Sequence, residues 1–484
     1  MKKILLGIAG LLVIIIAIML IKTATFTSKQ VEVTQQDMIA VDRMAVAQHL
    51  SGAIQLKTIS WQEESRFNPA AFLELHRYLE KTYPLVHKTM TREKVAGYSL
   101  LFTWKGSDPS KKPVLLMAHQ DVVPIEAGTE GDWTYPGFSG RIADGFVWGR
   151  GALDIKNGLV SILDAMENLI RQGFKPERTI YLAFGHDEEI GGKGAAAMSA
   201  LLEKRGVKLE YVVDEGGAIM EGMVPGVKKP VALIGIAEKG YMTLELTVKG
   251  EGGHSSMPPE HTTVGILSKA ICAIESNPFS ADLKGAAEKM FQYVGPEMSF
   301  PLNMVMANLW LLEPVLEGQL KGSQATNASL RTTAAATMIR GSDKENVLPQ
   351  KATAMVNFRI IPGETMDSVT EHVRDAIDDE RVQIRRTENS NGPSGVSDVE
   401  SKEFTALRAT INTLFPDVIV APYLVLGATD SRHYSNLTDK IFRFIPERMK
   451  PEDLERQHGT NERIGIDELA DCVRYYMMLM QSTQ

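Results

Sequence analysis

The 484-residue chain is longer than one hydrophobic core usually supports, so we expect two or three domains. Its 44% hydrophobic and 23% charged residues, without a low-complexity tract, exclude a disordered scaffold. The formal net charge of -8 argues against nucleic acid as a partner, because phosphate binding needs a basic face. Cys272 and Cys472 are too few for a disulfide scaffold or a thiolate metal site.

The N-terminus has the pattern of a membrane anchor. Lys2 and Lys3 precede an uncharged run, 4–21, which Lys22 closes. As a helix this run would rise about 27 Å, close to the hydrocarbon thickness of a bilayer. It is longer than the apolar part of a cleaved signal peptide, so we predict an uncleaved signal-anchor helix at 1–22 and a polar stalk at 23–37. The paired lysines predict a cytoplasmic N-terminus, with the catalytic domain on the non-cytoplasmic side of a single-pass membrane protein.

The rest of the chain changes its pattern twice. Helical spacing predicts helices at 42–56 and 70–83, and short apolar runs at 114–118, 179–184 and 211–213 predict strands buried on both faces. We therefore expect an α/β domain with a mostly parallel central sheet flanked by helices, and residues 38–237 form its first part. Alternating strands at 241–248 and 352–361 predict an inserted α+β domain at 238–363. The α/β domain resumes at 364–484.

Potential metal ligands follow the predicted strands. The first strand leads to His119 and Asp121, the second to 186–189, and the third to Asp214 and Glu215, while a glycine-rich segment carries Asp154. Each acid alone is as well explained as a solvated loop residue or a helix cap. Together they predict a site, because the carboxyl ends of parallel strands meet at one edge of a sheet.

Histidine and carboxylates without cysteine are typical of a hydrolytic Zn²⁺ or Mn²⁺ site. Alternate spacing places His119 and Asp121 on one side of an extended segment, so Asp121 can orient a metal-binding His119. Of the neighbours Glu188 and Glu189, one can bind metal while the other accepts a proton from the attacking water.

Six segments of the chain resemble one family of metallopeptidases. The family includes carboxypeptidase S, aminoacylase, glutamate carboxypeptidase and succinyl-diaminopimelate desuccinylase. The match runs in order from about residue 40 to the end. The segments that carry it are MAHQDVVP (117–124), GRGALDIKNG (149–158), GHDEEIGGKGA (185–195), VDEGG (213–217), GGHSSMPP (252–259) and QHGTNE (457–462). The HDEE and DEGG forms look most similar to carboxypeptidase S and to animal enzymes that hydrolyse or form N-fatty-acyl amino acids.

The resemblance implies a zinc-exopeptidase-like fold with two Zn²⁺ ions per subunit, for which Mn²⁺ or Co²⁺ can substitute. The resemblance implies one ligand that bridges the two metals, two further ligands for each metal, and a general base. The implied metal ligands are Asp154, His119, Asp214, Glu189 and His458; Glu188 is the implied base and Asp121 the partner of His119.

The resemblance also implies roles for the inserted domain, as a lid and a homodimerisation surface. His254 would reach the active site of the neighbouring subunit and stabilise the oxyanion. Arg359 would bind the carboxylate of the substrate, although an exposed strand arginine is the ordinary alternative. The segment 427–433 resembles the substrate-pocket loop of the family, without a role for any one residue.

These expectations leave the substrate open. The main prediction is a carboxypeptidase S-like exopeptidase that cuts amide bonds next to a free carboxylate in a peptide. The alternative is an aminoacylase-like hydrolase or synthase of N-acyl amino acids. A rival from another class, a non-catalytic binding protein on the same fold, is less favoured because every expected ligand and the base are present.

Overall fold

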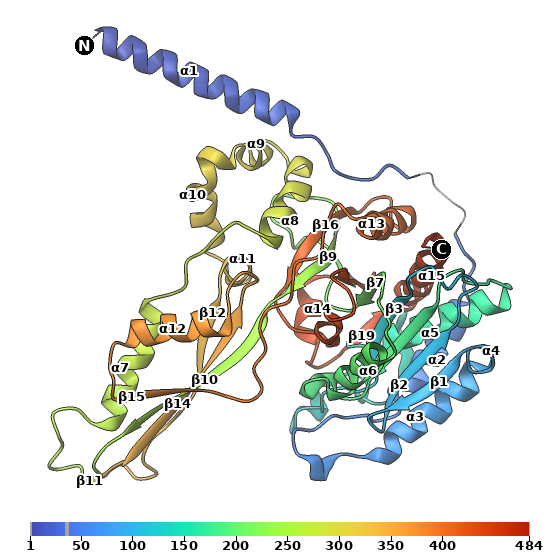
Figure 1. The fold of residues 1–484 in the computed structure, drawn as a ribbon, viewed down its shortest axis with the longest axis horizontal. Helices are drawn as coiled ribbons and strands as arrows, with labels where there is room; N and C mark the ends of the chain where they lie inside the picture. The colour runs from blue at the N-terminus through green and yellow to red at the C-terminus, as the bar shows by residue number, and fades with distance from the viewer. Residues whose placement is uncertain (1, 34–37, 484) are drawn as a thin grey trace.

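The computed structural model describes residues 2–33 and 38–483 (Figure 1). Helix α1 (Lys2–Thr25) projects away from two units, each built around its own sheet. The larger unit contains a ten-stranded sheet and the smaller unit a four-stranded sheet. The end of the expected stalk, 34–37, lies outside the described residues.

The ten-stranded sheet confirms the predicted α/β class. Its path runs β1-β2-β6-β3-β7-β17-β9-β8-β18, and β16 pairs with β9. The central pairs β6–β3, β3–β7 and β7–β17 are parallel, while β1–β2 and β2–β6 at one edge are antiparallel. The strands are β1 (Thr91–Val95), β2 (Ser99–Trp104), β3 (Val114–His119), β6 (Ile180–Gly185), β7 (Tyr211–Asp214), β8 (Ile219–Met220), β9 (Val231–Glu238), β16 (Ile419–Val425), β17 (Ile441–Arg443) and β18 (Arg448–Met449).

Helices cover both faces of this sheet, which explains the continuous apolar runs. In β3, Leu116 faces a core that includes residues of α2, α5 and α15, whereas Leu115 and Met117 face a second core that includes residues of α6. Successive side chains of a strand point to opposite faces, so a strand covered twice is apolar throughout. The helices of this unit are α2 (Arg43–Ile54), α3 (Pro69–Thr82), α4 (Pro84–Thr89), α5 (Lys156–Arg171), α6 (Lys193–Lys204), α13 (Lys402–Leu414), α14 (Pro451–Arg456) and α15 (Ile466–Ser482).

The smaller unit has a separate core beneath one face of its sheet. The strand order is β12-β14-β10-β15, and all its pairs are antiparallel. Buried and half-buried residues alternate along β14, as expected for a sheet covered on one face. The elements are β10 (Gly240–Lys249), β12 (Thr333–Arg340), β14 (Lys351–Ile360), β15 (Val382–Arg386), α7 (Thr263–Ser276) and α12 (Met366–Ile377).

Two observations differ from the expected boundaries of the inserted domain, 238–363. Strand β15 pairs with β10, and α12 shares the small core with α7, so 364–386 packs with the smaller unit. The helical segment between α7 and β12 instead contributes to the large core, with Tyr293 and Leu316 buried there. Its helices are α8 (Ala286–Val294), α9 (Leu302–Ala307), α10 (Leu309–Leu320) and α11 (Gln324–Leu330). Hydrophobic pattern gave the element types but not the core that each element joins.

Short elements complete the described chain. They are β4 (Arg141–Ala143), β5 (Phe146–Trp148) and β19 (Arg463–Gly465) in one small sheet, β11 (Gly253–His254) and β13 (Val347–Leu348) in another, and the 3-10 turns η1 (Glu64–Arg66), η2 (Glu130–Asp132), η3 (Glu188–Ile190), η4 (Gly295–Glu297) and η5 (Asp430–Tyr434).

Candidate metal centre

The cluster lies at the carboxyl ends of three adjacent parallel strands. His119 ends β3, Glu189 lies in η3 just after β6, and Glu215 follows β7. Asp154 comes from the loop before α5, and His458 from the loop after α14. These five residues are far apart in sequence, and the shared sheet edge brings the first three together, as the sequence pattern predicted.

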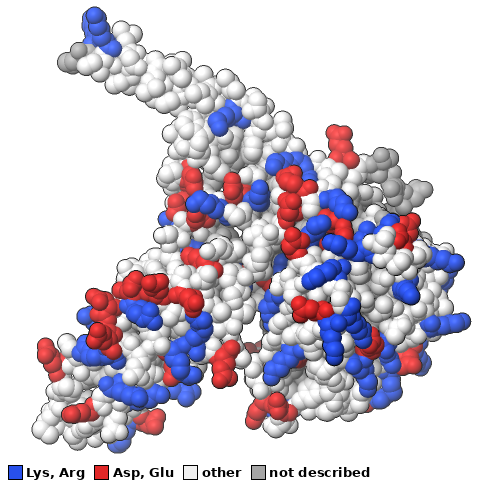
Figure 2. All heavy atoms as spheres, viewed as in Figure 1, with Lys and Arg blue, Asp and Glu red and all other residues white. Residues whose placement is uncertain are grey.

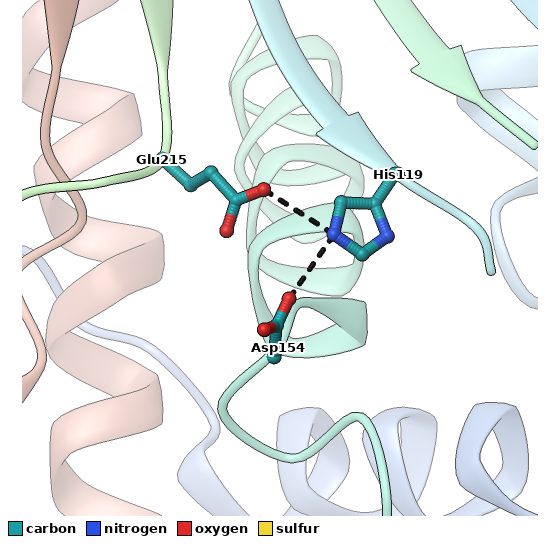
Figure 3. A group of neighbouring side chains, drawn as sticks. All are labelled: His119, Asp154 and Glu215. Atoms are coloured by element: carbon teal, nitrogen blue, oxygen red, sulfur yellow. Dashed lines mark hydrogen bonds and ion pairs between the residues drawn. The ribbon is translucent and has the colours of Figure 1, made fainter. Parts of the chain in front are cut away.

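Asp154 lies between two groups of potential ligands. His119 Nε2 is 3.1 Å from Asp154 Oδ1 and 3.2 Å from Glu215 Oε1 (Figure 3). On the other side, His458 Nε2 is 2.9 Å from Asp154 Oδ2 and 3.3 Å from Glu189 Oε2. Within each group the ligand atoms lie within 4.8 Å of one another. Each Asp154 oxygen therefore faces a different histidine, an arrangement in which one carboxylate can bridge two cations.

Glu215, rather than the predicted ligand Asp214, lies beside His119 and Asp154. Asp214 is buried, and its Oδ2 accepts a hydrogen bond of 2.9 Å from the backbone N–H of Ser431. Adjacent residues of an extended chain point in opposite directions, so only one of the two acids can face His119. Gly216 follows at a φ of 113°, which favours glycine, and lets the chain turn away directly after Glu215.

Asp121 connects His119 to the turn that carries the two glutamates. Its Oδ1 lies 3.4 Å from His119 Nδ1, and its backbone oxygen lies 3.0 Å from the same nitrogen. Its carboxylate also accepts 3.2 Å hydrogen bonds from the backbone N–H groups of Glu188 and Glu189, and one of 2.7 Å from Ser60. Asp121 is thus placed to orient the imidazole and the η3 turn together.

Burial, together with neighbouring charges, raises the pKa of three carboxyl groups of the cluster, those of Glu215, Glu189 and Glu188. Burial, with the charge of Asp154, raises the pKa of Glu215 to about 8. Burial also raises the pKa of Glu189, together with the charge of Asp154, and raises that of Glu188 well above its usual range. Keeping all these buried carboxyl groups ionised beside only two histidines would cost free energy unless further positive charge were bound there.

The residues fit a pair of divalent cations. Hydrogen bonds to Asp154 and Glu189 raise the pKa of His458 to about 10, and a cation bound between these groups would compete with that proton. Glu189 Oε1 is buried and has no hydrogen-bond partner among the described residues. Nitrogen and oxygen donors without a thiolate suit Zn²⁺, Mn²⁺ or Co²⁺.

A buried ion pair that the sequence analysis missed joins the two ligand loops. Arg150 Nη1 lies 2.6 Å from Glu462 Oε2, and Arg150 Nη2 donates to the backbone oxygen of His458 at 3.0 Å. Glu462 Oε1 accepts from the backbone N–H groups of Gly151, Leu153 and Asp154 at 2.8–3.1 Å. Both residues lie inside quoted motifs, GRGALD and QHGTNE, but no sequence pattern distinguishes their contact from that of exposed charges.

His458 also has an unusual backbone conformation. Its φ is 59°, in the left-handed region that costs a residue with a side chain of order 1–3 kcal/mol. The hydrogen bond from Arg150 to its carbonyl fixes this conformation, which directs the imidazole toward Asp154.

A cavity of about 370 Å³ opens next to the cluster. Its ionisable lining residues include Asp154, Glu188, Glu189, Glu215 and His458. The wall also includes apolar side chains, namely Leu153, Ile155, Met220, Tyr423, Val425, Leu426, Ile445, Met449 and Leu454. Gly427, Ala428 and Thr429 from the predicted pocket loop also line it. The cavity therefore offers both ionisable groups and apolar side chains to a ligand.

The two predicted residues of the smaller unit lie outside this cavity wall. His254 is exposed in β11 at the end of the unit far from the large sheet, with Nδ1 2.8 Å from Ser256 Oγ (Figure 1). Arg359 is half-buried in β14, and its guanidinium carbon lies 4.9 Å from the centre of the Tyr241 ring. The structure brings neither residue into the cluster of its own chain.

Known proteins with similar sequences cover nearly the whole chain. A "Probable carboxypeptidase S-like 2" of Dictyostelium discoideum is 41% identical over 99% of this chain and 93% of its own length. A human "N-fatty-acyl-amino acid synthase/hydrolase PM20D1" is 42% identical over 91% of this chain and 88% of its own. The yeast (Saccharomyces cerevisiae) "Carboxypeptidase S" is 33% identical over 88% and 81%. These similarities confirm the predicted enzyme class, a metallopeptidase-type amide hydrolase.

A solved structure and a family model agree with this result. An "M20 family metallo-carboxypeptidase" from Sulfolobus solfataricus shares the fold with a TM-score of 0.67 at 18% identity, covering 91% of this chain and 99% of that chain. The model of "Peptidase family M20/M25/M40" matches residues 115–482, which include the cluster and the cavity. The chain belongs to this peptidase family.

Proposed function

We propose that this protein is a two-zinc hydrolase that cuts the amide bond next to a free carboxylate. The observation that carries the proposal is the position of Asp154, shared by two histidine–acid groups beside Glu188 in one cavity. His119, Asp154 and Glu215 would hold one ion, and Asp154, Glu189 and His458 would hold the other. Bound there, the ions supply Lewis acidity and make water a stronger nucleophile near neutral pH.

Glu188 acts as general base and then as general acid. It lines the cavity beside the ligands, and burial raises its pKa, which makes its carboxylate a stronger base; it accepts a proton from the attacking water and returns it to the leaving amine. Asp121 keeps His119 and the η3 turn in position while Glu188 moves the proton.

His254 and Arg359 take part from outside the cluster. We assign His254 to the oxyanion across a homodimer interface, and Arg359 to the carboxylate of the substrate. The exposure of β11 supports this role for His254. The edge strand β12, in which Met338 and Ile339 are 47% and 54% exposed, supports a contact between two copies.

The substrate class that fits best is a peptide cut at its C-terminus, as in a carboxypeptidase S-like exopeptidase. A second candidate, an N-acyl amino acid with a fatty chain, is favoured by the apolar wall formed by residues such as Met220, Val425 and Met449. Both substrates place a carboxylate on one side of the scissile amide, and only the acyl side differs.

Helix α1 is long and apolar enough to cross a membrane, and none of its candidate span is buried in the described structure. We propose that it is an uncleaved anchor that holds the catalytic domain on the non-cytoplasmic side. The lysines at positions 2 and 3 support this orientation.

The substrate experiment compares a blocked dipeptide with a long-chain N-acyl amino acid, using the membrane-bound full chain with and without a chelator. Chelator-sensitive cleavage of the dipeptide alone identifies a carboxypeptidase, and cleavage mainly of the fatty amide identifies an N-acyl amino acid hydrolase. If neither is cut after zinc is restored, this proposal is wrong.

The metal experiment measures zinc by mass spectrometry in wild type, Glu215→Gln and Asp214→Asn. We expect two equivalents in the wild type and loss of metal in Glu215→Gln, with less loss in Asp214→Asn. A wild type that purifies without stoichiometric metal would support a non-catalytic binding protein instead.

A further inference from the structure

Helix α10 has two apolar faces, and only one of them is packed. Leu309, Leu316 and Leu320 lie on one side and pack against the large core. At about 100° per residue, Trp310, Leu311, Pro314 and Val315 form a stripe on the opposite side. A helix that is apolar on two sides usually has a partner on both.

The second stripe is open to solvent in the described structure. Trp310 is 52% exposed, Leu311 40% and Val315 59%, and Phe300 just before α9 is 70% exposed. Glu317 pairs with Lys321 at 2.5 Å along the edge of the stripe that Trp310 forms. Single exposed apolar residues are common, but a continuous stripe indicates a binding surface.

The stripe is next to the C-terminal end of the candidate membrane helix. Asn308, just before α10, donates from Nδ2 to the backbone oxygen of Met19 at 3.2 Å and to Thr23 Oγ1 at 3.3 Å. Lys22, which closes the apolar run, places its Nζ 5.9 Å from the centre of the Trp310 ring. Figure 1 shows α9 and α10 beside this end of α1, and Figure 2 shows few charged groups on the surface they share.

We propose that the stripe on α10, together with Phe300, is a second membrane contact that lies in the lipid interface beside α1. This inference rests on the proposed anchor. Lys22 is at the level where an apolar span meets the headgroups, and Trp310 beside it is the residue type that most favours this level. Leu311 and Val315 reach the acyl boundary, as the apolar side of an interfacial helix does.

A bilayer fits the stripe better than a soluble protein does. With α1 in the membrane, the hydrogen bonds of Asn308 hold α9 and the start of α10 against its end, so lipid is the nearest apolar phase. The contact would limit how the body rotates about the single helix, because two separate points then touch the membrane. A second copy of the chain is the competing occupant.

The test measures tryptophan fluorescence of the full chain in vesicles of phosphatidylcholine with brominated acyl chains. The chain has five tryptophans, and bromine quenches only those in contact with lipid. We expect quenching of one tryptophan's share of the emission in wild type and in Trp61→Phe, and none in Trp310→Phe. Trp61 is a matched control because it lies in the larger unit, with its ring centre 3.2 Å from the Arg66 guanidinium carbon.

A second measurement does not depend on Trp310. In a Cys272→Ser background, an environment-sensitive dye on Val315→Cys should shift to the blue when vesicles are present, whereas the same dye on Ser342→Cys should not. No shift, together with unquenched Trp310, overturns the proposal. A blue shift that appears without lipid and grows with protein concentration also overturns the proposal, and indicates a contact between two copies of the chain.

Flotation of the full chain in alkaline carbonate tests the anchor separately. Flotation without Trp310 quenching means that α1 is an anchor and α10 is not a membrane contact. Quenching of Trp310 in vesicles without carbonate-resistant flotation means that α10 touches lipid although α1 does not span it.

Discussion

The predicted site residues fall into two regions with different surroundings. In the larger unit, His119 and Asp154 are almost fully buried, and Asp121 and Glu462 fix the loops around them. In the smaller unit, His254 is exposed at the end of a two-stranded sheet, and Arg359 contacts the ring of Tyr241. The first region is organised within one chain, whereas the proposed roles of His254 and Arg359 would require domain movement or a second chain.

The two regions differ in how firmly the fold of one chain holds their functional groups in place. Groups at the ends of adjacent parallel strands keep their spacing because the sheet is rigid and packed on both faces. An exposed group such as His254 is not held by packing in its own chain, so its proposed contribution would depend on dimerisation. The predictions below test whether the two regions act in the same reaction.

Glu188→Gln should have the largest effect. Removing the base should lower turnover about 10²–10⁴-fold, because general acid–base catalysis contributes that much. Zinc content should stay at the wild-type level, since Glu189 and Glu215 remain. The exposed Glu126→Gln is the matched control, and near-normal turnover of the Glu188 variant would refute the assigned role.

His254→Ala should lower turnover about 10²–10³-fold, the usual cost of one lost oxyanion donor, without loss of metal. If His254 acts across a dimer, mixing this variant with Glu188→Gln should restore activity, to about a quarter of wild type for random C2 dimers. The exposed His261→Ala in the same segment is the control. Absence of rescue in a proven heterodimer would place the action of His254 within one chain.

Glu462→Gln should weaken metal binding about 10–100-fold, as changes to residues that orient ligands do. The change removes the charge that pairs with Arg150 and weakens the contacts that hold the Asp154 and His458 loops. Zinc titration with a competing chelator measures the affinity, and thermal unfolding should show a lower Tm. The exposed Glu455→Gln should change neither value.

Arg359→Lys should have the smallest effect, an increase in KM of about tenfold with little change in kcat. Lysine keeps the positive charge but cannot form the bidentate hydrogen bonds that arginine makes with a carboxylate. The exposed Arg385→Lys on β15 of the same sheet serves as control. An unchanged KM would identify Arg359 as a structural residue of β14.

Much of the larger unit was predictable because the local hydrophobic pattern indicates its strands, and the ligand-type residues follow directly after those strands. The runs at 114–118 and 211–213 became β3 and β7, and the acids after them met at one edge. The choice between Asp214 and Glu215 was not predictable, because it depends on which side chain faces His119 after the strand ends. Arg150 and Glu462 were missed for a related reason: their contact joins residues 312 positions apart.

By itself the sequence determined the fold class, the strands of the parallel sheet, the apolar N-terminal helix and the types of ligand in the cluster. These features follow from periodicity and residue chemistry, which act over a few neighbouring positions. Only the tertiary structure decided that Glu215 faces His119, that α12 and β15 join the smaller unit, and that α10 keeps an apolar stripe beside α1. These depend on contacts between distant segments, whose geometry no local pattern encodes.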